Sequence, residues 1–239
     1  MGIWVSAEYS CLQVQGVSYR APGTQQNLLN QVTFSLPEKS LGLVYGRSGS
    51  GKTTLLQVLG GLAKPTEGSI YIQKTGLDGQ LNQSPETLSA SKVGIVFQFP
   101  ERFFLADTVL EELTFGWPRQ LEDQLLRQRL VMRLESAIRA VGLSGISLDL
   151  NPRSLSDGFK RRLALAVQLV RMPDILLLDE PLAGLDWKAR TDVVKLLETL
   201  KKERMLIVVS HDLKEISPLV DKAWRMDMGG FLIEEPLFT

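Results

Sequence analysis

The sequence lacks the residues that crosslink small extracellular proteins and any run long enough to cross a bilayer. Cys11 is the single cysteine among 239 residues, so no disulfide can form within the chain, and a reducing compartment is the simpler interpretation. No window approaches the roughly 18 to 20 consecutive apolar residues of a membrane-spanning helix. We therefore expect a chain that builds its own hydrophobic core and does not itself span a membrane.

The sequence also lacks an excess of charge and a secretory leader. Lys and Arg number 27, as do Asp and Glu, and this balance argues against a general nucleic-acid partner. The arginines interspersed between 127 and 139 are interpreted as a solvated helix face. The first residues have no basic and apolar signal regions. Gly2 and Ser6 fit the N-myristoylation pattern, but so short a pattern often matches by chance.

Apolar residues recur with two different periods along the chain. They alternate at 12–14 and 32–36, on either side of a turn-rich stretch at 21–27, which predicts an antiparallel sheet near the N-terminus. Nearly continuous apolar runs at 41–45, 93–97, 175–178 and 206–209 are typical of strands buried on both faces. The first is followed by a predicted helix over 52–62, the order of an α/β unit.

Between the second and third of these apolar strands, residues 99–172 are predicted to be almost wholly helical. Leu121, Leu125, Leu134, Ile138 and Val141 recur mostly every four residues, which indicates an amphipathic helix. The sequence thus predicts one domain over 1–239, with a core formed by about 1–98 and 173–239 and a helical lobe over about 99–172. The fold class is α/β.

A glycine-rich motif lies between the strand at 41–45 and the helix that follows. Residues 46–53, GRSGSGKT, satisfy G-x-x-x-x-G-K-[ST], a loop whose backbone N–H groups surround phosphate oxygens at a helix N-terminus. Lys52 is predicted to reach the β and γ phosphates, and Thr53 to place its hydroxyl on Mg²⁺. The predicted nucleotide-binding residues here are Gly46, Arg47, Ser48, Gly49, Ser50, Gly51, Lys52, Thr53 and Thr54.

Two carboxylates follow the apolar strand at 175–178. Asp179 is the candidate to hold Mg²⁺ through water, and Glu180 the candidate to orient or deprotonate an attacking water. Carboxylates at a strand end are also common on solvated surfaces, but the phosphate loop upstream favours the functional interpretation. His211, the single histidine, follows the strand at 206–209, at the end where the other groups gather.

The order of these motifs resembles that of the ATP-binding subunits of ABC transporters along almost the whole chain. The resemblance implies that Gln98 contacts the metal and the attacking water, and that His211 senses the γ-phosphate. Residues 155–159, LSDGF, resemble the signature whose Ser156 and Gly158 grip the phosphate bound to an opposite subunit. Residues 183–186 resemble the D-loop. The resemblance implies ATP and Mg²⁺ as cofactors and a second ATPase subunit, identical or different.

The stretch FQFPE at 97–101, followed by TVLEE at 108–112, resembles energy-coupling-factor and cobalt-type importers. LSDGFKRR and DEPLAGLDWKAR resemble stand-alone ABC proteins of cyanobacteria and plastids. The first resemblance implies an ATP-hydrolysing importer subunit, cytoplasmic and peripheral at the inner face of a membrane, that couples dimer closure to an integral membrane protein. The alternative is a soluble ABC ATPase that acts as an assembly scaffold in metal-cofactor biogenesis. SMC-like proteins, tandem translation factors and small-molecule kinases fit less well.

Three positions depart from the family pattern. Ala21 stands where an aromatic ring usually stacks on adenine, so we expect weaker base affinity unless Tyr19 or another ring substitutes. Asp157 and Phe159 stand where the signature usually has glycine and a polar or acidic residue. Asp157 would repel a phosphate unless it points away or caps the following helix. We therefore expect slow turnover as a homodimer, or pairing with an ATPase whose signature is intact.

Overall fold

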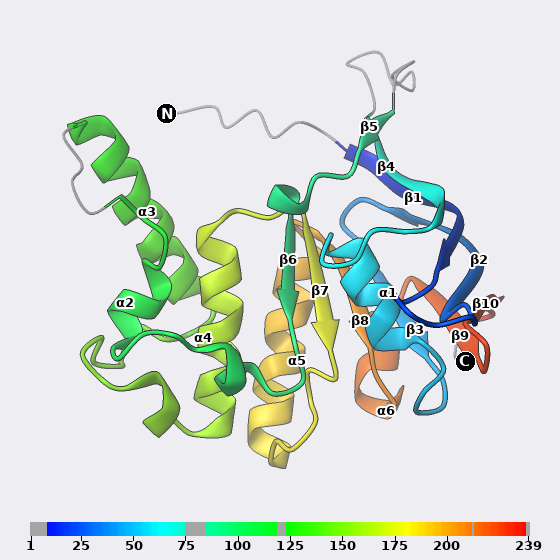
Figure 1. Cartoon of the computed structure of the whole chain (residues 1–239). Helices are drawn as coiled ribbons and strands as arrows, with labels where there is room; N and C mark the ends of the chain where they lie inside the picture. Colours follow the sequence, from blue (N-terminus) through cyan, green and yellow to red (C-terminus); the bar gives the residue numbers. More distant parts are fainter. Residues whose placement is uncertain (1–8, 75–84, 119–122, 212, 238–239) are drawn as a thin grey trace.

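Two β-sheets organise the computed structural model, which describes residues 9–74, 85–118, 123–211 and 213–237 (Figure 1). Gly2, Ser6, Leu121 and Glu122 lie outside the described residues. The strands are β1 (Tyr9–Tyr19), β2 (Leu29–Pro37), β3 (Leu41–Tyr45), β4 (Glu67–Lys74), β5 (Glu86–Thr87), β6 (Val93–Val96), β7 (Ile175–Asp179), β8 (Met205–Val209), β9 (Lys222–Asp227) and β10 (Phe231–Glu235).

The helices fill the connections between the strands and cover the larger sheet. The α-helices are α1 (Lys52–Leu59), α2 (Val109–Leu113), α3 (Gln124–Ala140), α4 (Asp157–Val170), α5 (Trp187–Lys201) and α6 (Leu213–Ile216). Short 3₁₀ turns occur at Ala90–Lys92, Pro100–Phe103, Pro152–Ser154 and Ser217–Leu219. No helix within the described ranges is both long and apolar enough to cross a membrane.

The smaller sheet is antiparallel, in the order β2-β1-β4-β5. In its central pairing, Leu12 lies opposite Leu36 on β2 and Ile72 on β4. The prediction of an antiparallel lobe near the N-terminus is confirmed. β4 and β5 were not predicted, because the apolar residues of β4 are confined to Ile70, Tyr71 and Ile72 and β5 has none.

The larger sheet has the order β10-β9-β3-β8-β7-β6. Its inner strands run parallel, with Val208 of β8 opposite Leu43 of β3 and Leu178 of β7, and only β10 is antiparallel to its neighbour. The predicted strands at 41–45, 175–178 and 206–209 are confirmed as its centre. β6 ends at Val96, one residue before the predicted end. β9 and β10 were not predicted.

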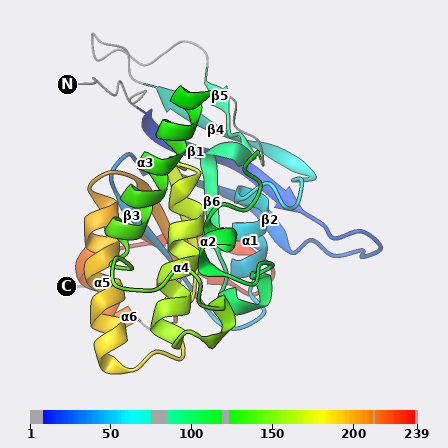
Figure 2. The same cartoon turned by 90° about the vertical axis from the view of Figure 1, so that its left-hand side faces the viewer.

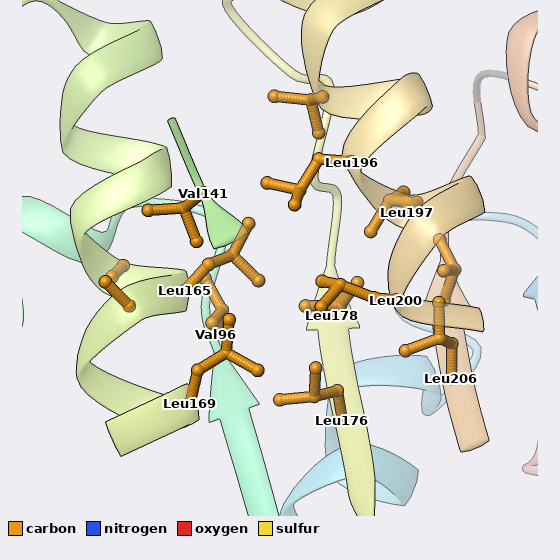
Figure 3. Packing of buried hydrophobic residues seen from close by; sticks show 14 of the residues in the cluster. Val96, Val141, Leu165, Leu169, Leu176, Leu178, Leu196, Leu197, Leu200 and Leu206 are labelled. Carbon is orange, nitrogen blue, oxygen red and sulfur yellow. The ribbon is translucent and has the colours of Figure 1, made fainter. Parts of the chain in front are cut away.

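Hydrophobic side chains fill both faces of the larger sheet because neighbouring residues of a strand point in opposite directions. Leu176 and Leu178 pack against α4 and α5 (Figure 3). Ile175 and Leu177 face α1 and the antiparallel sheet, where they share a second core with residues such as Leu55. α1 therefore lies between the two sheets, and α4 and α5 cover the opposite face. This arrangement confirms the predicted α/β fold class.

The helical segment contains more irregular chain than the sequence suggested. Residues 99–172 hold α2, α3 and α4, but non-helical stretches separate them, so the expectation of an almost wholly helical segment is wrong in detail. α1 also ends at Leu59 rather than at 62. Gly60 closes the helix with a backbone bond to Leu56 O of 2.8 Å, and Gly61 has a φ of 72°, a left-handed conformation that stops helices.

Candidate functional site

The phosphate-loop motif forms a tight turn at the carboxyl end of β3. Gly46 and Gly51 have φ angles of 150° and 107°, which L-residues rarely adopt. A Cβ on Gly46 would lie 2.2 Å from Met226 O, and one on Gly51 would lie 2.7 Å from Leu28 O. Both glycines are therefore required by conformation and by close packing. The loop leads directly into α1, whose first N–H groups have no partner within the helix.

Lys52 is folded back onto its own loop. Its Nζ donates to Gly46 O at 2.9 Å and to Arg47 O at 2.8 Å. The ammonium is thus held over the turn in a position suited to an anion enclosed by the loop. Ser50 Oγ is buried and has no hydrogen-bond partner within the described part of the chain.

Asp179, at the end of β7, meets the first turn of α1. Its Oδ2 accepts a hydrogen bond of 2.9 Å from Thr53 Oγ1, and the residue is 7% exposed. Burial raises the pKa of Asp179, a shift that the neighbouring Glu180 reinforces and that the Thr53 hydrogen bond opposes. A carboxylate desolvated in this way gains from a nearby cation. Carboxylate and hydroxyl oxygens are the donors that Mg²⁺ prefers.

Glu180 is connected to the end of β8. Its Oε1 lies 2.7 Å from His211 Nδ1, and its Oε2 accepts from Ser210 Oγ at 3.2 Å. The backbone of Glu180 has a φ of 49°, a left-handed conformation that costs a residue with a side chain about 1–3 kcal/mol and is concentrated at functional sites. The structure therefore holds this carboxylate in one orientation, with a titratable imidazole against it.

These side chains share one cavity of about 590 Å³ at the carboxyl ends of the parallel strands. Arg47 and Ser50 belong to its loop but do not line it, and Ser156 and Gly158 are absent from its walls. The cavity combines loop amides, one ammonium group and two carboxylates, a set suited to a polyanion with a divalent cation. Its lining is formed by Leu28, Gly46, Ser48, Gly49, Gly51, Lys52, Thr53, Thr54, Gln98, Asp179, Glu180 and His211.

The signature residues lie on a different surface. Ser156 precedes α4, and with Gly158 and Phe159 it lines a hollow of about 300 Å³ beside Asp186, at the start of α5. A single chain therefore does not bring Ser156 and Gly158 to its own phosphate cavity. In the single chain, the signature hollow and the phosphate cavity are separate surfaces.

Asp157 is placed where its charge is tolerated. It is the first residue of α4, where the helix dipole favours a carboxylate, and its Oδ1 lies 3.2 Å from Lys160 Nζ. Its side chain is 73% exposed. Phe159 is also exposed, with the Arg162 guanidinium 5.6 Å from its ring centroid. Both departures from the signature pattern thus face solvent in the single chain.

Apolar contact for a base is offered by Leu28 rather than by an aromatic ring. Leu28 is 42% exposed and lines the phosphate cavity. Tyr19 is partly buried and packs against the core shared by the antiparallel sheet and α1, so it is committed to packing. Ala21 lies in the turn between β1 and β2 and is half-buried. Of these three residues, Leu28 alone lines the phosphate cavity.

A buried arginine connects two loops of the site and was missed by the sequence reasoning. Arg161, on α4, is 4% exposed and donates to Phe97 O at 3.1 Å and to Ala183 O at 3.3 Å. It thereby ties the chain beside Gln98 to the loop that follows Glu180. Burial lowers the pKa of Arg161, although the residue stays charged. The apolar neighbours of Arg161 on α4 were the signal that it points inward.

The glycine loop at a helix N-terminus, placed beside two strand-end carboxylates in a parallel sheet, defines a P-loop nucleoside-triphosphatase. The family model described as "ABC transporter" matches residues 29–183. The chain belongs to the ABC transporter family and is an ATP-binding ATPase of the ABC type.

Relatives and solved structures agree with this assignment. The chain is 62% identical over 231 residues to "ABC transporter I family member 11, chloroplastic" of Arabidopsis thaliana, covering 97% of this chain and 83% of that one. It is 36% identical to "Energy-coupling factor transporter ATP-binding protein EcfA2" of Acetivibrio thermocellus, covering 91% and 77%. The cbiO1 structure from Clostridium perfringens, part of the ABC transporter complex cbiONQ, superimposes with a TM-score of 0.76 at 27% identity, covering 95% and 88%.

Proposed function

We propose that the chain is the ATP-binding and ATP-hydrolysing subunit of an ABC-type importer. The observation that carries the proposal is the cavity in which Lys52, Asp179, Glu180 and His211 converge on the glycine loop. The importer assignment is supported by the FQFPE stretch and by the likeness to EcfA2 and cbiO1. The same likeness supports a division into a core, about 1–98 and 173–239, and a helical lobe, about 99–172.

The residues of the cavity have separate roles in ATP hydrolysis. The loop amides and Lys52 bind the phosphates and stabilise the charge that develops on the γ-phosphoryl group. Glu180 accepts a proton from the attacking water, which it orients through Oε1 or Oε2. His211 Nδ1 lies 2.7 Å from Glu180 Oε1. A γ-phosphate competing for this imidazole would release the carboxylate toward the water.

The cavity also fits Mg²⁺ as a second cofactor. Thr53 Oγ1 and Asp179 Oδ2 are 2.9 Å apart, and Gln98 lines the same cavity. In the described residues no cluster of three or more His, Cys, Asp or Glu side chains forms a metal cage. This agrees with Mg²⁺, which proteins commonly bind through one or two carboxylates plus substrate phosphates. When bound, the ion would neutralise phosphate charge between these residues.

A second ATPase subunit, identical or different, completes the site in this proposal. Ser156 and Gly158 face away from the phosphate cavity of their own chain, so a head-to-tail pair would place them against the nucleotide of the partner. A related cassette at 27% identity and TM-score 0.70 has been solved as a dimer bound to ADP and Pi. ATP would then act as a bridge between the two chains.

The surface beside Gln98 suits an integral membrane partner. Phe99, Phe103, Leu105 and Phe115 are 45%, 55%, 68% and 53% exposed, although large apolar side chains are usually buried. They follow the strand that ends next to the nucleotide cavity. We propose that this surface receives the coupling segment of a separate membrane protein, which places the chain at the inner face of a membrane. No nucleic-acid partner is proposed.

One observation favours a second candidate, the assembly scaffold without a pore. Asp157 adds a carboxylate to the signature surface, and although Lys160 Nζ lies 3.2 Å away, this charge would oppose the phosphate of a partner's nucleotide and slow turnover. Gentle purification from native membranes separates the two functions. A stable complex with an integral membrane protein supports the importer, and a complex made only of metal-cofactor assembly proteins would replace it.

Mg-ATP is expected to drive dimer formation in the purified chain. We expect light scattering after gel filtration to show more dimer with Mg-ATP than with Mg-ADP. Lys52→Ala is expected to abolish the difference, because it removes the cation that lies over the loop. Lys64→Ala, a change of the same type outside the cavity, should retain it. A monomer at saturating Mg-ATP, with ATP bound, would contradict a homodimer and require a different second subunit.

Ala21→Tyr is expected to tighten ATP binding by about tenfold. Stacking of a base on an aromatic ring is worth about 1–3 kcal/mol, and the cavity offers Leu28 in its place. Isothermal titration with ATP and GTP measures the gain and the change in base preference. Ala21→Leu, which adds bulk without a ring, is the control and should gain less. Equal affinities for wild type and Ala21→Tyr would contradict the placement of the base near residue 21.

A further inference from the structure

A second cavity lies between α3, α4 and α5, away from the nucleotide site. Its volume is about 360 Å³, within the range of about 300–1,000 Å³ typical of small-molecule sites. The three helices lie side by side on one side of the larger sheet (Figure 2). This helix cavity shares no lining residue with the phosphate cavity or with the signature hollow.

The floor of the helix cavity is apolar. Leu169 on α4 and Leu200 on α5 line it and also belong to the hydrophobic core (Figure 3). Met132 and Met172 lie at its edge and are 60% and 43% exposed. Methionine adapts to irregular apolar ligands because its side chain is flexible and polarisable. The helix cavity can therefore bury a hydrocarbon or aromatic group against a floor that is already packed.

The rim of the helix cavity is positively charged. Arg129, Arg133 and Arg204 line it, against the single acid Glu203. Nε of Arg133 and Nε of Arg204 are buried and have no hydrogen-bond partner among the described residues. A buried donor without a partner destabilises the folded protein, because no hydrogen bond compensates its desolvation. Both donors belong to arginines that line the same cavity, so cationic side chains with incomplete hydrogen bonding gather at this rim.

Arg204 is fixed at this rim by the local chain. It follows α5 and donates through Nη1 to Pro173 O, and burial lowers its pKa, although an arginine remains charged. Met172, next to Pro173, has a φ of 55°. A residue with a side chain adopts this left-handed conformation at a cost. The left-handed residue ends α4 and directs the chain to Pro173, and the rim presents a desolvated cation that an anionic ligand would help to stabilise.

We infer that the helix cavity binds an amphipathic anion, a molecule with one carboxylate or phosphate group on an apolar body. The anionic group would accept hydrogen bonds from the guanidinium groups of Arg133 and Arg204 at the rim, because the planar fork of arginine matches both anions. The apolar body would lie on Leu169 and Leu200. A free phosphate would leave the apolar floor uncovered, and a neutral lipid would leave both arginine donors without partners.

Octyl phosphate and octanoate are the probes for this site, and isothermal titration of the full chain is the measurement. We expect at least one of them to bind saturably with one site per chain, and the tighter of the two identifies the anionic group. Octanol and octyltrimethylammonium should show no saturable binding. Binding of the cationic or neutral amphiphile as tight as that of the anions would overturn the inference, as would no binding of either anion.

Three variants test whether the anion binds in the helix cavity. Arg133→Gln should weaken the anion at least tenfold, since a charged hydrogen bond contributes about 1.5–3 kcal/mol. Arg139→Gln, the same change on the same helix outside the cavity, should have no effect. Ala140→Trp, which fills the cavity without changing charge, should abolish binding while the thermal unfolding temperature confirms the fold. Equal affinity in all three variants would contradict the site.

The effect of Mg-ADP on anion binding distinguishes this inference from the proposed function. Saturating Mg-ADP, or the Lys52→Ala substitution, should leave the binding of the octyl anions unchanged, because the two cavities share no residue. Competition by ADP would show that the phosphate loop had captured the probe, which overturns the inference and leaves the ATPase intact. Failure of nucleotide binding with retained anion binding would instead contradict the proposed phosphate site alone.

Discussion

Glu180→Gln is expected to lower ATP hydrolysis by about 10²–10⁴-fold and to leave ATP binding intact. General-base catalysis contributes a factor of this size, and an amide cannot accept the proton of the attacking water. Glutamine keeps the shape of the side chain and can still accept from Ser210 Oγ, which lies 3.2 Å from Glu180 Oε2. The loop and Lys52 remain unchanged. The variant should therefore accumulate with ATP bound, as a dimer that does not reopen.

Phosphate release under saturating Mg-ATP measures the rate, and light scattering measures the dimer. Glu198→Gln makes the same change on an exposed face of α5 and should hydrolyse ATP at the parental rate. The assignment of Glu180 fails if Glu180→Gln hydrolyses ATP as fast as wild type. Loss of both binding and hydrolysis would indicate a structural role for this carboxylate.

The predictable parts of the site are those whose functional residues are neighbours in the chain. Residues 46–53 carry both the glycines and the charged ligand of the loop, and Asp179 and Glu180 follow a strand whose apolar run identifies it. The contact between Glu180 and His211 joins positions far apart in sequence. The strand that precedes His211 placed it at the same end of the sheet, and the resemblance to a family gave it a role there. The structure adds that Nδ1 and Oε1 are 2.7 Å apart.

The parts that were not predictable depend on tertiary contacts. β9 and β10 pair at the edge of the larger sheet, where β10 is mostly exposed and has no clear period. Arg161 was not predicted to be a site residue. In the structure its side chain points from α4 into the core, where it donates hydrogen bonds to Phe97 O and Ala183 O. Arg129 and Arg133 were interpreted as a solvated face. Burial of Arg133 Nε depends on the packing of α3 on α4, which no local pattern encodes.

Asp179→Asn is expected to stabilise the nucleotide-free protein at neutral pH. Burial raises the pKa of Asp179 above that of the unfolded chain, so the folded state binds more protons across the interval between the two values. The contribution of Asp179 to stability therefore falls as pH rises through that interval. Asparagine carries no charge, so the variant avoids this loss of stability, and its side-chain oxygen can still accept a hydrogen bond from Thr53 Oγ1. The gain should be full above the raised pKa and disappear below the ordinary value of an aspartate.

Urea unfolding at pH 8 and pH 4 measures this effect, because pH 4 lies close to the ordinary aspartate value of 3.8. The difference in free energy of unfolding between Asp179→Asn and wild type should be larger at pH 8. Asp149→Asn, at an exposed position, should show no difference at either pH. A variant less stable than wild type at pH 8 would mean that the contacts of the carboxylate outweigh its desolvation.

With Mg-ATP bound, wild type should become more stable than Asp179→Asn. The buried carboxylate destabilises the protein in the absence of a cation, and the same charge attracts Mg²⁺ when the ion is present. Loss of a residue that orients a metal through water typically weakens metal affinity or activity about 10–100-fold. Wild type should therefore gain more stability from Mg-ATP than Asp179→Asn does, by about 1.4–2.7 kcal/mol for that range of affinities at saturation. ATP with excess chelator, which removes Mg²⁺, should reduce the difference between the stability gains of the two proteins. An equal gain in both proteins would place the metal away from Asp179, and the raised pKa would then reflect burial alone.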